Sequence, residues 1–339
     1  MKICGTGTVC AHGRGMAALE SVLTSGAVPP SQIAVPFRDV PFPVYAVAPE
    51  ILKDRTVLGE MRRADRFSKM ATLAAYDAMA ESGATLENPE RVGIIFATAF
   101  GPHNTTFSFL DDILNYGDAG VSPTIFSNSV HNAAVSYISH TLKIKGPTWT
   151  ITSFHDPFQQ ALLLAQVWLD EGRCDQVLVG AGDECGMVLN YVCSQKLAIA
   201  ETAAQMRPFF NTAGPAVIPG ELSVFFLLSR DTSGGVQIIL RQKDLPAPDL
   251  LIVDFESRQL DLRSAQIPTG CWSHLIGATP VSTAFSCAVA GLMLQRQKVY
   301  CAGNLLNGYG GINSDFLSVR LQRIECNGKI GLYKLEEAV

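Results

Sequence analysis

The fold is decided by the stretch GPTWTITSFHDPFQQALLLAQVWLDE, residues 146–171. Residues 148–152 (TWTIT) are aromatic and β-branched, which favours a strand. Pro157 suits the first turn of a helix because its missing N–H needs no partner there. Apolar residues from Phe158 to Leu169 cover well over one stripe, which predicts a helix buried in a large core. His155 and Asp156 therefore occupy the bend between strand and helix, where several folds present a reactive side chain above backbone N–H groups.

The composition indicates a globular protein with a sizeable core. Of the 339 residues, 47% are hydrophobic and 17% are charged, so we expect one compact two-lobed unit or a tight oligomer. The 26 basic and 31 acidic residues give a net charge of −5, which argues against a nucleic-acid partner. The apolar region Val281–Leu294 is too short, and too often interrupted by hydroxyl residues, to span a membrane.

The cysteines and the first residues predict the compartment. The nine cysteines are scattered without a CxxC pair, which is typical of a reduced cytoplasm. Neither they nor the six histidines show the spacing of a metal site. The opening MKICGTGTVCAHGRG lacks the apolar stretch of a signal peptide and is typical of a first strand and turn. We therefore expect a cytoplasmic protein without metal or cofactor.

Residue patterns predict the remaining elements. Strands are expected at residues 2–9, 91–98, 175–180, 221–229, 236–241 and 250–255, and those at 221–229 and 236–241 are expected to pair with each other. Helices are expected at residues 16–24, 66–83, 107–114, 133–142 and 281–294. The Pro-rich passage at residues 28–50 is expected to be irregular.

The chain contains an internal repeat. His155, a buried helix, Arg173 and the strand VLVGAG correspond to a second series with the same order. The second series is His274, a buried helix, Arg296 and VYCAGN. This repeat suggests a duplicated α/β unit with two central helices between two sheets.

Short motifs resemble those of the β-ketoacyl synthases of the thiolase fold. In chain order they are Ala64-Asp65-Arg66-Phe67-Ser68, Arg91-Val92-Gly93, Gly146-Pro147, Arg207-Pro208-Phe209, Ser273-His274-Leu275-Ile276-Gly277-Ala278 and Asn307-Gly308-Tyr309-Gly310-Gly311-Ile312-Asn313. The resemblance implies an α/β thiolase-like fold with a layered αβαβα architecture. Its two halves would be residues 1–214 and a shortened residues 215–339. Residues 122–134 (SPTIFSNSVHNAA) are similar to the divergent chain-length-factor-like subunits of aryl-polyene-type pathways.

Departures from the family's pattern fall on its catalytic positions. Counted without gaps from Gly146, the family's nucleophilic Cys falls on His155. The family's Lys falls on Thr269, and its first active-site His falls near Asp254, so that only His274 is retained. Condensation needs a thiolate that holds the acyl chain as a thioester, whereas an acyl-imidazole hydrolyses readily. The resemblance therefore implies a subunit that does not condense by itself.

Each candidate catalytic residue has a functional and a structural interpretation. His155 either polarises a thioester carbonyl or fills a vestigial pocket, and Asp156 either orients an imidazole or caps the following helix. His274 either keeps its family role or is a satisfied polar residue before the second central helix. Cys271 offers a replacement thiol, and His131 either lines a pocket or has a structural role where a helix opens.

The resemblance also assigns pocket and docking residues. The pocket residues are Asp156, Thr269, Tyr309, Gly310 and Gly311, and the docking residues are Arg62, Arg63 and Arg207. Synthases bind strongly acidic acyl carrier proteins near these arginine positions, and the alternative for the arginines is a solvated face.

The sequence thus predicts a synthase-like subunit that completes a heterodimer with a Cys-bearing ketosynthase and meets an acyl carrier protein. Its contribution would be one wall of the acyl tunnel. Two alternatives stay open. One is an active thioester decarboxylase or hydrolase that uses His155 and His274, and the other is a homodimeric acyl-binding protein without turnover.

Overall fold

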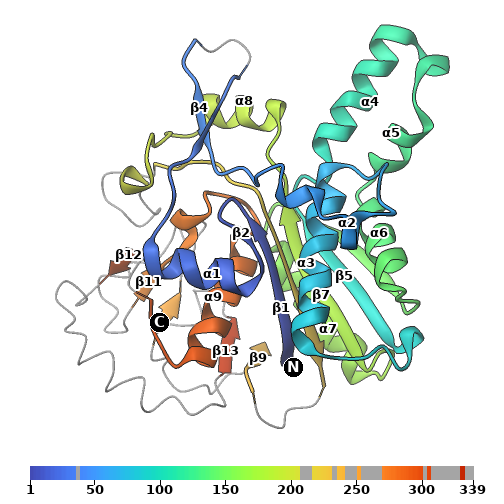
Figure 1. The fold of residues 1–339 in the computed structure, drawn as a ribbon, viewed down its shortest axis with the longest axis vertical. Helices are drawn as coiled ribbons and strands as arrows, with labels where there is room; N and C mark the ends of the chain where they lie inside the picture. Colours follow the sequence, from blue (N-terminus) through green and yellow to red (C-terminus); the bar gives the residue numbers. More distant parts are fainter. Residues whose placement is uncertain are drawn as a thin grey trace.

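The computed structural model of the chain describes residues 1–35, 39–206, 216–230, 235–240, 250–252, 269–300, 304–306 and 329–332 (Figure 1). Within these ranges, eight strands form the main sheet, in the order β13-β9-β1-β8-β7-β5-β6 with β2 attached to β1. Their bounds are Lys2–Cys10 (β1), Gly13–Arg14 (β2), Val92–Thr98 (β5), Thr148–Thr152 (β6), Gln176–Asp183 (β7), Leu222–Ser229 (β8), Gln237–Leu240 (β9) and Lys329–Leu332 (β13).

Three neighbouring strands of the main sheet, β6, β5 and β7, run parallel to one another. β5 lies between β6 and β7 and is parallel to both, whereas β8 runs antiparallel to β7 and β1. The carboxyl ends of these strands therefore lie side by side, and the residues that follow Thr98, Thr152 and Asp183 come together there.

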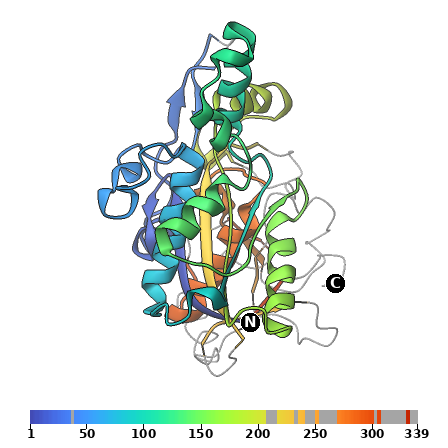
Figure 2. The same cartoon turned by 90° about the vertical axis from the view of Figure 1, so that its right-hand side faces the viewer.

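Alternate residues of the central strands enter two separate cores. The helices on one face are α1 (Gly15–Ser25), α7 (Pro157–Asp170) and α9 (Ser282–Arg296), and those on the other are α3 (Arg66–Ser82) and α6 (Ala133–Leu142). In β5, Ile95 and Ala97 join the core that contains α7. Ile94 and Phe96 join the core that contains α3. Figure 2 shows α3 and α7 on opposite sides of the sheet, so β5 is buried on both faces, as its continuous apolar sequence indicates.

Helix α3 approaches β1 closely because β1 has glycine, which lacks a side chain, at two positions that face the helix. A Cβ atom on Gly7 would lie 2.0 Å from the carbonyl oxygen of Ala74, and one on Gly5 would lie 2.2 Å from that of Ala78. The alternation of Gly with Thr in β1 therefore leaves room for the α3 backbone on one face of the strand.

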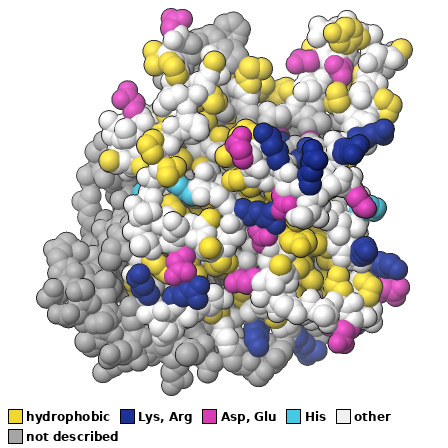
Figure 3. Space-filling model, viewed as in Figure 1, with side chains coloured by type: hydrophobic (Ala, Val, Ile, Leu, Met, Phe, Trp, Pro, Cys, Tyr) yellow, Lys and Arg dark blue, Asp and Glu magenta, His cyan; other side chains and the backbone are white. Residues whose placement is uncertain are grey.

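Two structures project beyond the main sheet (Figure 1). The first, here called the α4–α5 arm, spans residues 103–128 and contains α4 (His103–Tyr116), η3 (Asp118–Gly120) and α5 (Pro123–Asn128). The second combines the antiparallel pair β3 (Ser31–Ile33) and β4 (Phe42–Val44) with α8 (Met187–Lys196). In the space-filling view, the arm stands out from the body and carries several hydrophobic side chains (Figure 3).

A smaller sheet lies beside α9. It is formed by β10 (Leu251–Ile252), β11 (Thr269–Cys271) and β12 (Asn304–Leu306), in that order. The 3₁₀ turn η5 (Ser273–Leu275) follows β11, and Trp272 and Leu275 pack into the core of α7 and α9. The described layers are thus helices, main sheet, central helices and a second sheet. The remaining short elements are η1 (Ile51–Lys53), α2 (Arg55–Leu58), η2 (Pro89–Arg91) and η4 (Ala203–Gln205).

Most predicted elements are confirmed, and two predictions are wrong. The strands predicted at 221–229 and 236–241 do not pair with each other, because β1 lies between β8 and β9. The Pro-rich passage is not wholly irregular, since residues 31–33 and 42–44 form the β3–β4 pair. The helix predicted at 107–114 is confirmed, and it extends from His103 to Tyr116. Helix α8 was not predicted, because its short sequence lacks a clear apolar period.

Strands from both predicted halves share the main sheet. β8, β9 and β13 all follow residue 215, and β8 lies between β1 and β7 of the first half. The division at residues 214 and 215 therefore separates sequence segments that are joined by backbone hydrogen bonds, and it stays a prediction.

The close approach of α3 to β1 generates a stability prediction. Gly7→Ala should destabilise the protein by about 3 kcal/mol or more, because the new methyl group meets backbone atoms that cannot rotate away. Gly83→Ala is the control, since the same methyl group meets nothing within 4 Å and costs only about 1 kcal/mol for the left-handed φ of 62°. Urea unfolding of both variants checks the difference, and equal losses would contradict it.

Candidate functional site

Three loops meet where the parallel strands end. They are residues 99–102 after β5, residues 153–156 after β6 and residues 184–186 after β7. Phe154 of the second loop packs on Phe100 of the first, with ring centroids 5.3 Å apart, and Phe100 also lies edge-on to His103. The carboxyl ends of parallel strands are the usual place for a ligand site in α/β proteins. These three loops therefore form the candidate site.

Asp183 ties the ends of β5 and β7 together. Its buried carboxylate accepts hydrogen bonds from Thr98 Oγ1 at 2.6 Å, and from the N–H groups of Ala99 and Phe100 at 3.1 and 2.9 Å. Thr98 Oγ1 also accepts from the N–H of Gly101 at 2.8 Å. Burial raises the pKa of Asp183 to about 6, although these donors act in the opposite direction. One side chain thus fixes the whole turn after β5.

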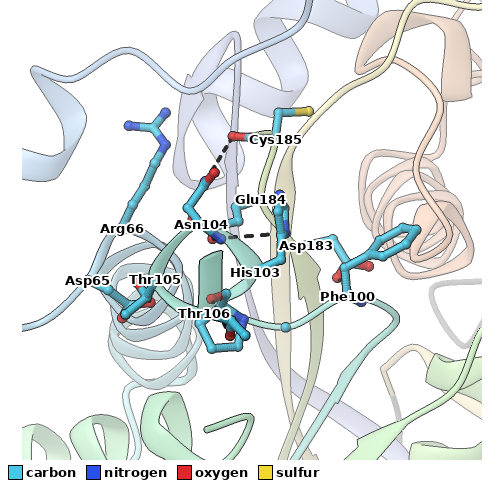
Figure 4. Close-up of polar contacts among 12 residues, drawn as sticks. Asp65, Arg66, Phe100, His103, Asn104, Thr105, Thr106, Asp183, Glu184 and Cys185 are labelled. Atoms are coloured by element: carbon cyan, nitrogen blue, oxygen red, sulfur yellow. Dashed lines mark hydrogen bonds and ion pairs between the residues drawn. The ribbon is translucent and has the colours of Figure 1, made fainter. Parts of the chain in front are cut away.

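Glu184 reaches the first turn of α4 (Figure 4). Its Oε1 atom accepts from the N–H of Asn104 at 3.0 Å and lies 4.0 Å from Nδ1 of His103. The side chain of Asn104 donates to the carbonyl oxygen of Cys185 at 3.3 Å, which links the same turn to the loop after β7. Burial raises the pKa of Glu184 to about 8 and lowers the pKa of His103.

A further carboxylate, Glu221, lies near Glu184. It is almost fully buried and pairs with the guanidinium of Arg66 at the start of α3. It also accepts from the backbone N–H of Val47 at 2.5 Å and from that of Cys185 at 3.0 Å. Asp65 caps α3 on the same side, and burial raises its pKa. Four carboxylates therefore surround the root of the α4–α5 arm.

The bend that contains His155 lies at the surface. His155 and Asp156 are both exposed, and the N–H of His155 donates to Ser153 Oγ at 3.2 Å. Asp156 adopts left-handed backbone angles, with φ 49° and ψ 43°, and its carboxylate bonds no backbone N–H of α7. It accepts instead from the side chain of Gln159 at 3.3 Å. The interpretation of Asp156 as a helix cap is therefore wrong, because an N-cap residue needs extended angles to aim its side chain at the helix.

The first turns of the two central helices meet. Gln159 Nε2 of α7 donates to Thr283 Oγ1 of α9 at 3.3 Å. Helix N-termini carry partial positive charge, so their convergence favours an anionic or strongly polar group nearby. His274 lies on η5, ahead of α9, and is buried at 7% exposure. The two predicted catalytic histidines thus occupy opposite environments, one in solvent and one in the interior.

Several predicted site residues lie beyond the described structure. Arg207, Asp254, Tyr309, Gly310 and Gly311 fall outside the described residues, and Thr269 begins β11. Arg62 and Arg63 are exposed just before α3. Cys271 is buried, and His131 is exposed two residues before α6. Sequence reasoning did not select His103, Asp183 or Glu184. An acidic pair directly after the apolar strand QVLVGAG was the signal that could have identified the last two.

Five of the described thiols are poor nucleophiles. Burial raises the pKa of five cysteines, which disfavours the thiolate: Cys10, Cys174, Cys185, Cys193 and Cys287. Among the described residues, no group of three or more His, Cys, Asp or Glu side chains is arranged to hold a metal ion. Within the same part of the chain, no helix has the length and apolar character that a membrane span requires.

Known sequences resemble the part of the chain that contains this site. Residues 54–196 match the family described as Beta-ketoacyl synthase, N-terminal domain. A polyunsaturated fatty acid synthase polypeptide of Thraustochytrium sp. (strain ATCC 26185 / S-3) is 29% identical over 126 residues. That match covers 37% of this chain and 6% of the much longer relative.

Solved structures share the fold over more of the chain. One is a type II polyketide synthase acyl-carrier protein in complex with its ketosynthase bound to the hexaketide, with a TM-score of 0.67 and 16% identity over 88% of this chain and 87% of the other. Another is the ishigamide ketosynthase/chain length factor, with a TM-score of 0.54 and 18% identity over 68% of this chain and 62% of the other. The thiolase-like fold predicted from the motifs is therefore confirmed, while identities this low establish the fold alone.

The role of Asp183 can be measured. Asp183→Ala should lower the free energy of unfolding by about 3–5 kcal/mol, because it leaves the buried donors of Thr98, Ala99 and Phe100 without an acceptor. Asp175→Ala is the matched control, since it removes a carboxylate from an exposed pair with Arg91 and should cost less than about 1 kcal/mol. Urea unfolding compares the two, and a small loss for Asp183→Ala would contradict its role as the tie between β5 and β7.

Proposed function

Because the chain has the fold of ketosynthases and resembles their N-terminal domain over residues 54–196, we propose that it is a non-condensing subunit of a ketosynthase heterodimer. It would act as a chain length factor does, by forming one wall of an acyl tunnel beside a Cys-bearing ketosynthase. The pathway would be one of fatty acid or polyketide synthesis, of the aryl-polyene type that residues 122–134 suggest. One sequence feature carries the proposal: counted without gaps from Gly146, the position of the family's nucleophilic Cys falls on His155.

The environment of His155 favours a role without covalent catalysis. The residue is exposed, and its backbone N–H bonds Ser153 Oγ within the same bend. An imidazole that held an acyl chain in water would lose it by hydrolysis, so a chain cannot be elongated there. The alternative thioester decarboxylase or hydrolase needs His155 and His274 at one carbonyl. The exposure of the first and the burial of the second give that alternative less support.

Strand β6 supports the partner in the proposal. It ends the main sheet among the described strands, and Trp149 on it is 58% exposed. An uncovered strand edge is a template for pairing with another chain. The N–H of Ser153 and the carbonyl oxygen of Pro147 bond to β5, so in a parallel ladder the odd-numbered N–H groups of β6 face β5. The N–H groups of Thr148, Thr150 and Thr152 consequently face away from the sheet, toward a partner.

The α4–α5 arm carries a second exposed apolar surface. Sixteen large apolar side chains are exposed in the described residues, and seven of them lie on the arm or directly after it. These seven are Phe107, Leu110, Ile113, Leu114, Tyr116, Phe126 and Val130. No Lys or Arg occurs from residue 92 to residue 142. A surface rich in aromatic residues and poor in lysine is typical of a protein interface.

Two exposed arginines support an acyl carrier protein as the second partner. Arg62 and Arg63 lie just before α3, and the backbone of Arg63 accepts a hydrogen bond from Asn128 at the end of the arm. Arg66 does not belong to this exposed pair, because its guanidinium pairs with the buried Glu221. In Figure 3, Lys and Arg side chains gather below the arm. Such a patch attracts an acidic carrier protein at low ionic strength without any catalytic group.

The proposal predicts what the isolated chain cannot do. The wild-type protein alone should not elongate an acyl group with malonyl carrier protein, as followed by mass spectrometry of the carrier. His155→Cys should not restore elongation, because the family's Lys and first His are replaced as well, and each missing oxyanion partner costs about 10²–10³ in rate. Elongation by the unmixed wild type would contradict the proposal. Restored elongation by His155→Cys would show that the other positions suffice.

The two sides of β6 predict different effects of proline, because a substitution on the outward side should affect assembly and one on the inward side should affect folding. Thr150→Pro removes an outward N–H only, so the chain should stay folded but lose its partner. Ile151→Pro is the control, because it removes a bond to β5 and should cost about 3 kcal/mol or more in stability. Light scattering and co-purification with a co-expressed Cys-bearing ketosynthase report assembly, and circular dichroism reports folding. A Thr150→Pro chain that still binds the ketosynthase would exclude β6 as the seam, and a wild-type homodimer that ignores the ketosynthase would favour a homodimeric acyl-binding protein.

A further inference from the structure

A buried acid and a buried imidazole face each other at the root of the α4–α5 arm. Glu184 is 1% exposed and His103, the first residue of α4, is 7% exposed. Glu184 Oε1 lies 4.0 Å from His103 Nδ1. Both ring nitrogens of His103 and the Oε2 atom of Glu184 are buried and, in the described structure, lack a hydrogen-bond partner. Such unpaired polar atoms are costly in a folded protein and call for an explanation.

The charges around the pair disfavour a second negative charge. Asp65 faces Glu184 from the start of α3, Glu221 from the start of β8, and Asp183 is its neighbour on β7. Arg66 interacts electrostatically with Glu184, but Glu221 already engages its guanidinium. The thiol of Cys185 stays protonated, because burial raises its pKa well above the usual value. An ionised Glu184 would therefore be buried among carboxylates with no cation of its own.

We propose that His103 and Glu184 form a proton-binding site that holds one proton between Glu184 Oε1 and His103 Nδ1, and that this proton keeps the first turn of α4 closed. In the neutral form, the carboxylic acid donates to the imidazole. If the proton crosses to the ring, the imidazolium donates to the carboxylate. Either form needs a single proton and a small approach of the two side chains from 4.0 Å.

The site controls the arm because Glu184 bonds the arm directly. Oε1 accepts the N–H of Asn104, and the side chain of Asn104 bonds the loop after β7. When the proton leaves, the charged carboxylate needs water, and because Glu184 is 1% exposed we expect the first turn of α4 to open to admit it. The apolar surface of the arm is then no longer held in one position.

The direction of the pH effect follows from the two shifts. The pKa of Glu184 is raised from 4.5 to about 8, so the closed form binds a proton that the open form releases over that range. The closed state is therefore favoured below this range and loses its advantage as pH rises toward 8. Burial is the largest cause that lowers the pKa of His103, so a second proton that would charge the ring is disfavoured at low pH. The pair therefore holds one proton at pH values below the ionisation of Glu184 and above the charging of the His103 ring.

Hydrogen exchange of the amides at residues 104–107 tests the site between pH 6.5 and 9.5. After correction for the intrinsic rate, protection in the wild type should fall by up to tenfold for each pH unit as pH rises to about 8, and level off above it. Glu184→Gln keeps an amide oxygen that can accept from Asn104 but cannot ionise, so its protection should not change with pH. Glu81→Gln is the control, because Glu81 also has a raised pKa but bonds Thr6 of β1, away from the arm. It should behave as the wild type does.

Titration of ¹³C-labelled glutamate carboxyls in the wild type provides a second measurement, which stands even if Glu184→Gln fails to fold. A Glu184 carboxyl that titrates below pH 6, or a pH dependence that persists in Glu184→Gln, would overturn the inference. Neither measurement involves a ketosynthase. A failure here therefore leaves the proposed heterodimer untouched, and a failure to form the heterodimer leaves this site untouched.

Discussion

The hydrogen bonds of Asp183 constrain everything at the candidate site. Three donors at the end of β5 would be buried without an acceptor if this carboxylate were absent. With it, the turn after β5 has one conformation, and that turn sets the direction in which α4 leaves the sheet. The next residue, Glu184, is thereby delivered to the first turn of the same helix. A two-residue segment at the end of β7 thus places the arm, its polar root and the aromatic contact with the bend after β6.

Local patterns predicted much of this fold because many elements depend on neighbouring residues. β6 has the bounds that aromatic and β-branched residues at 148–152 indicated, and α6 spans the predicted 133–142. The wrong pairing of β8 with β9 has a different origin. Two strands close in sequence usually pair, but β1, more than 200 residues earlier, inserts between them. The sequence near residue 230 contains no signal that the strand beginning at residue 2 pairs with both β8 and β9.

The candidate site was predicted only in part, for the same physical reason. The bond between Thr98 and Asp183 joins residues 85 positions apart, and that between Asn104 and Glu184 joins residues 80 apart. Such contacts become visible only once the strand order is known. The bend at His155 was correctly located between strand and helix, yet its exposure and the left-handed angles of Asp156 depend on the surrounding structure. The acidic pair after β7 was visible in the sequence, but its meaning required the position of α4.

The outward N–H groups of β6 affect how the stability of this protein can be quantified. If these groups are satisfied only by another chain, the folded and unfolded states differ in the number of molecules involved as well as in conformation. Mass action then enters the equilibrium, and a melting temperature rises with the concentration of the protein and of its partner. A single free energy of unfolding for the isolated chain would be incomplete as a description. The comparable quantity is the free energy of the complex at a stated standard concentration.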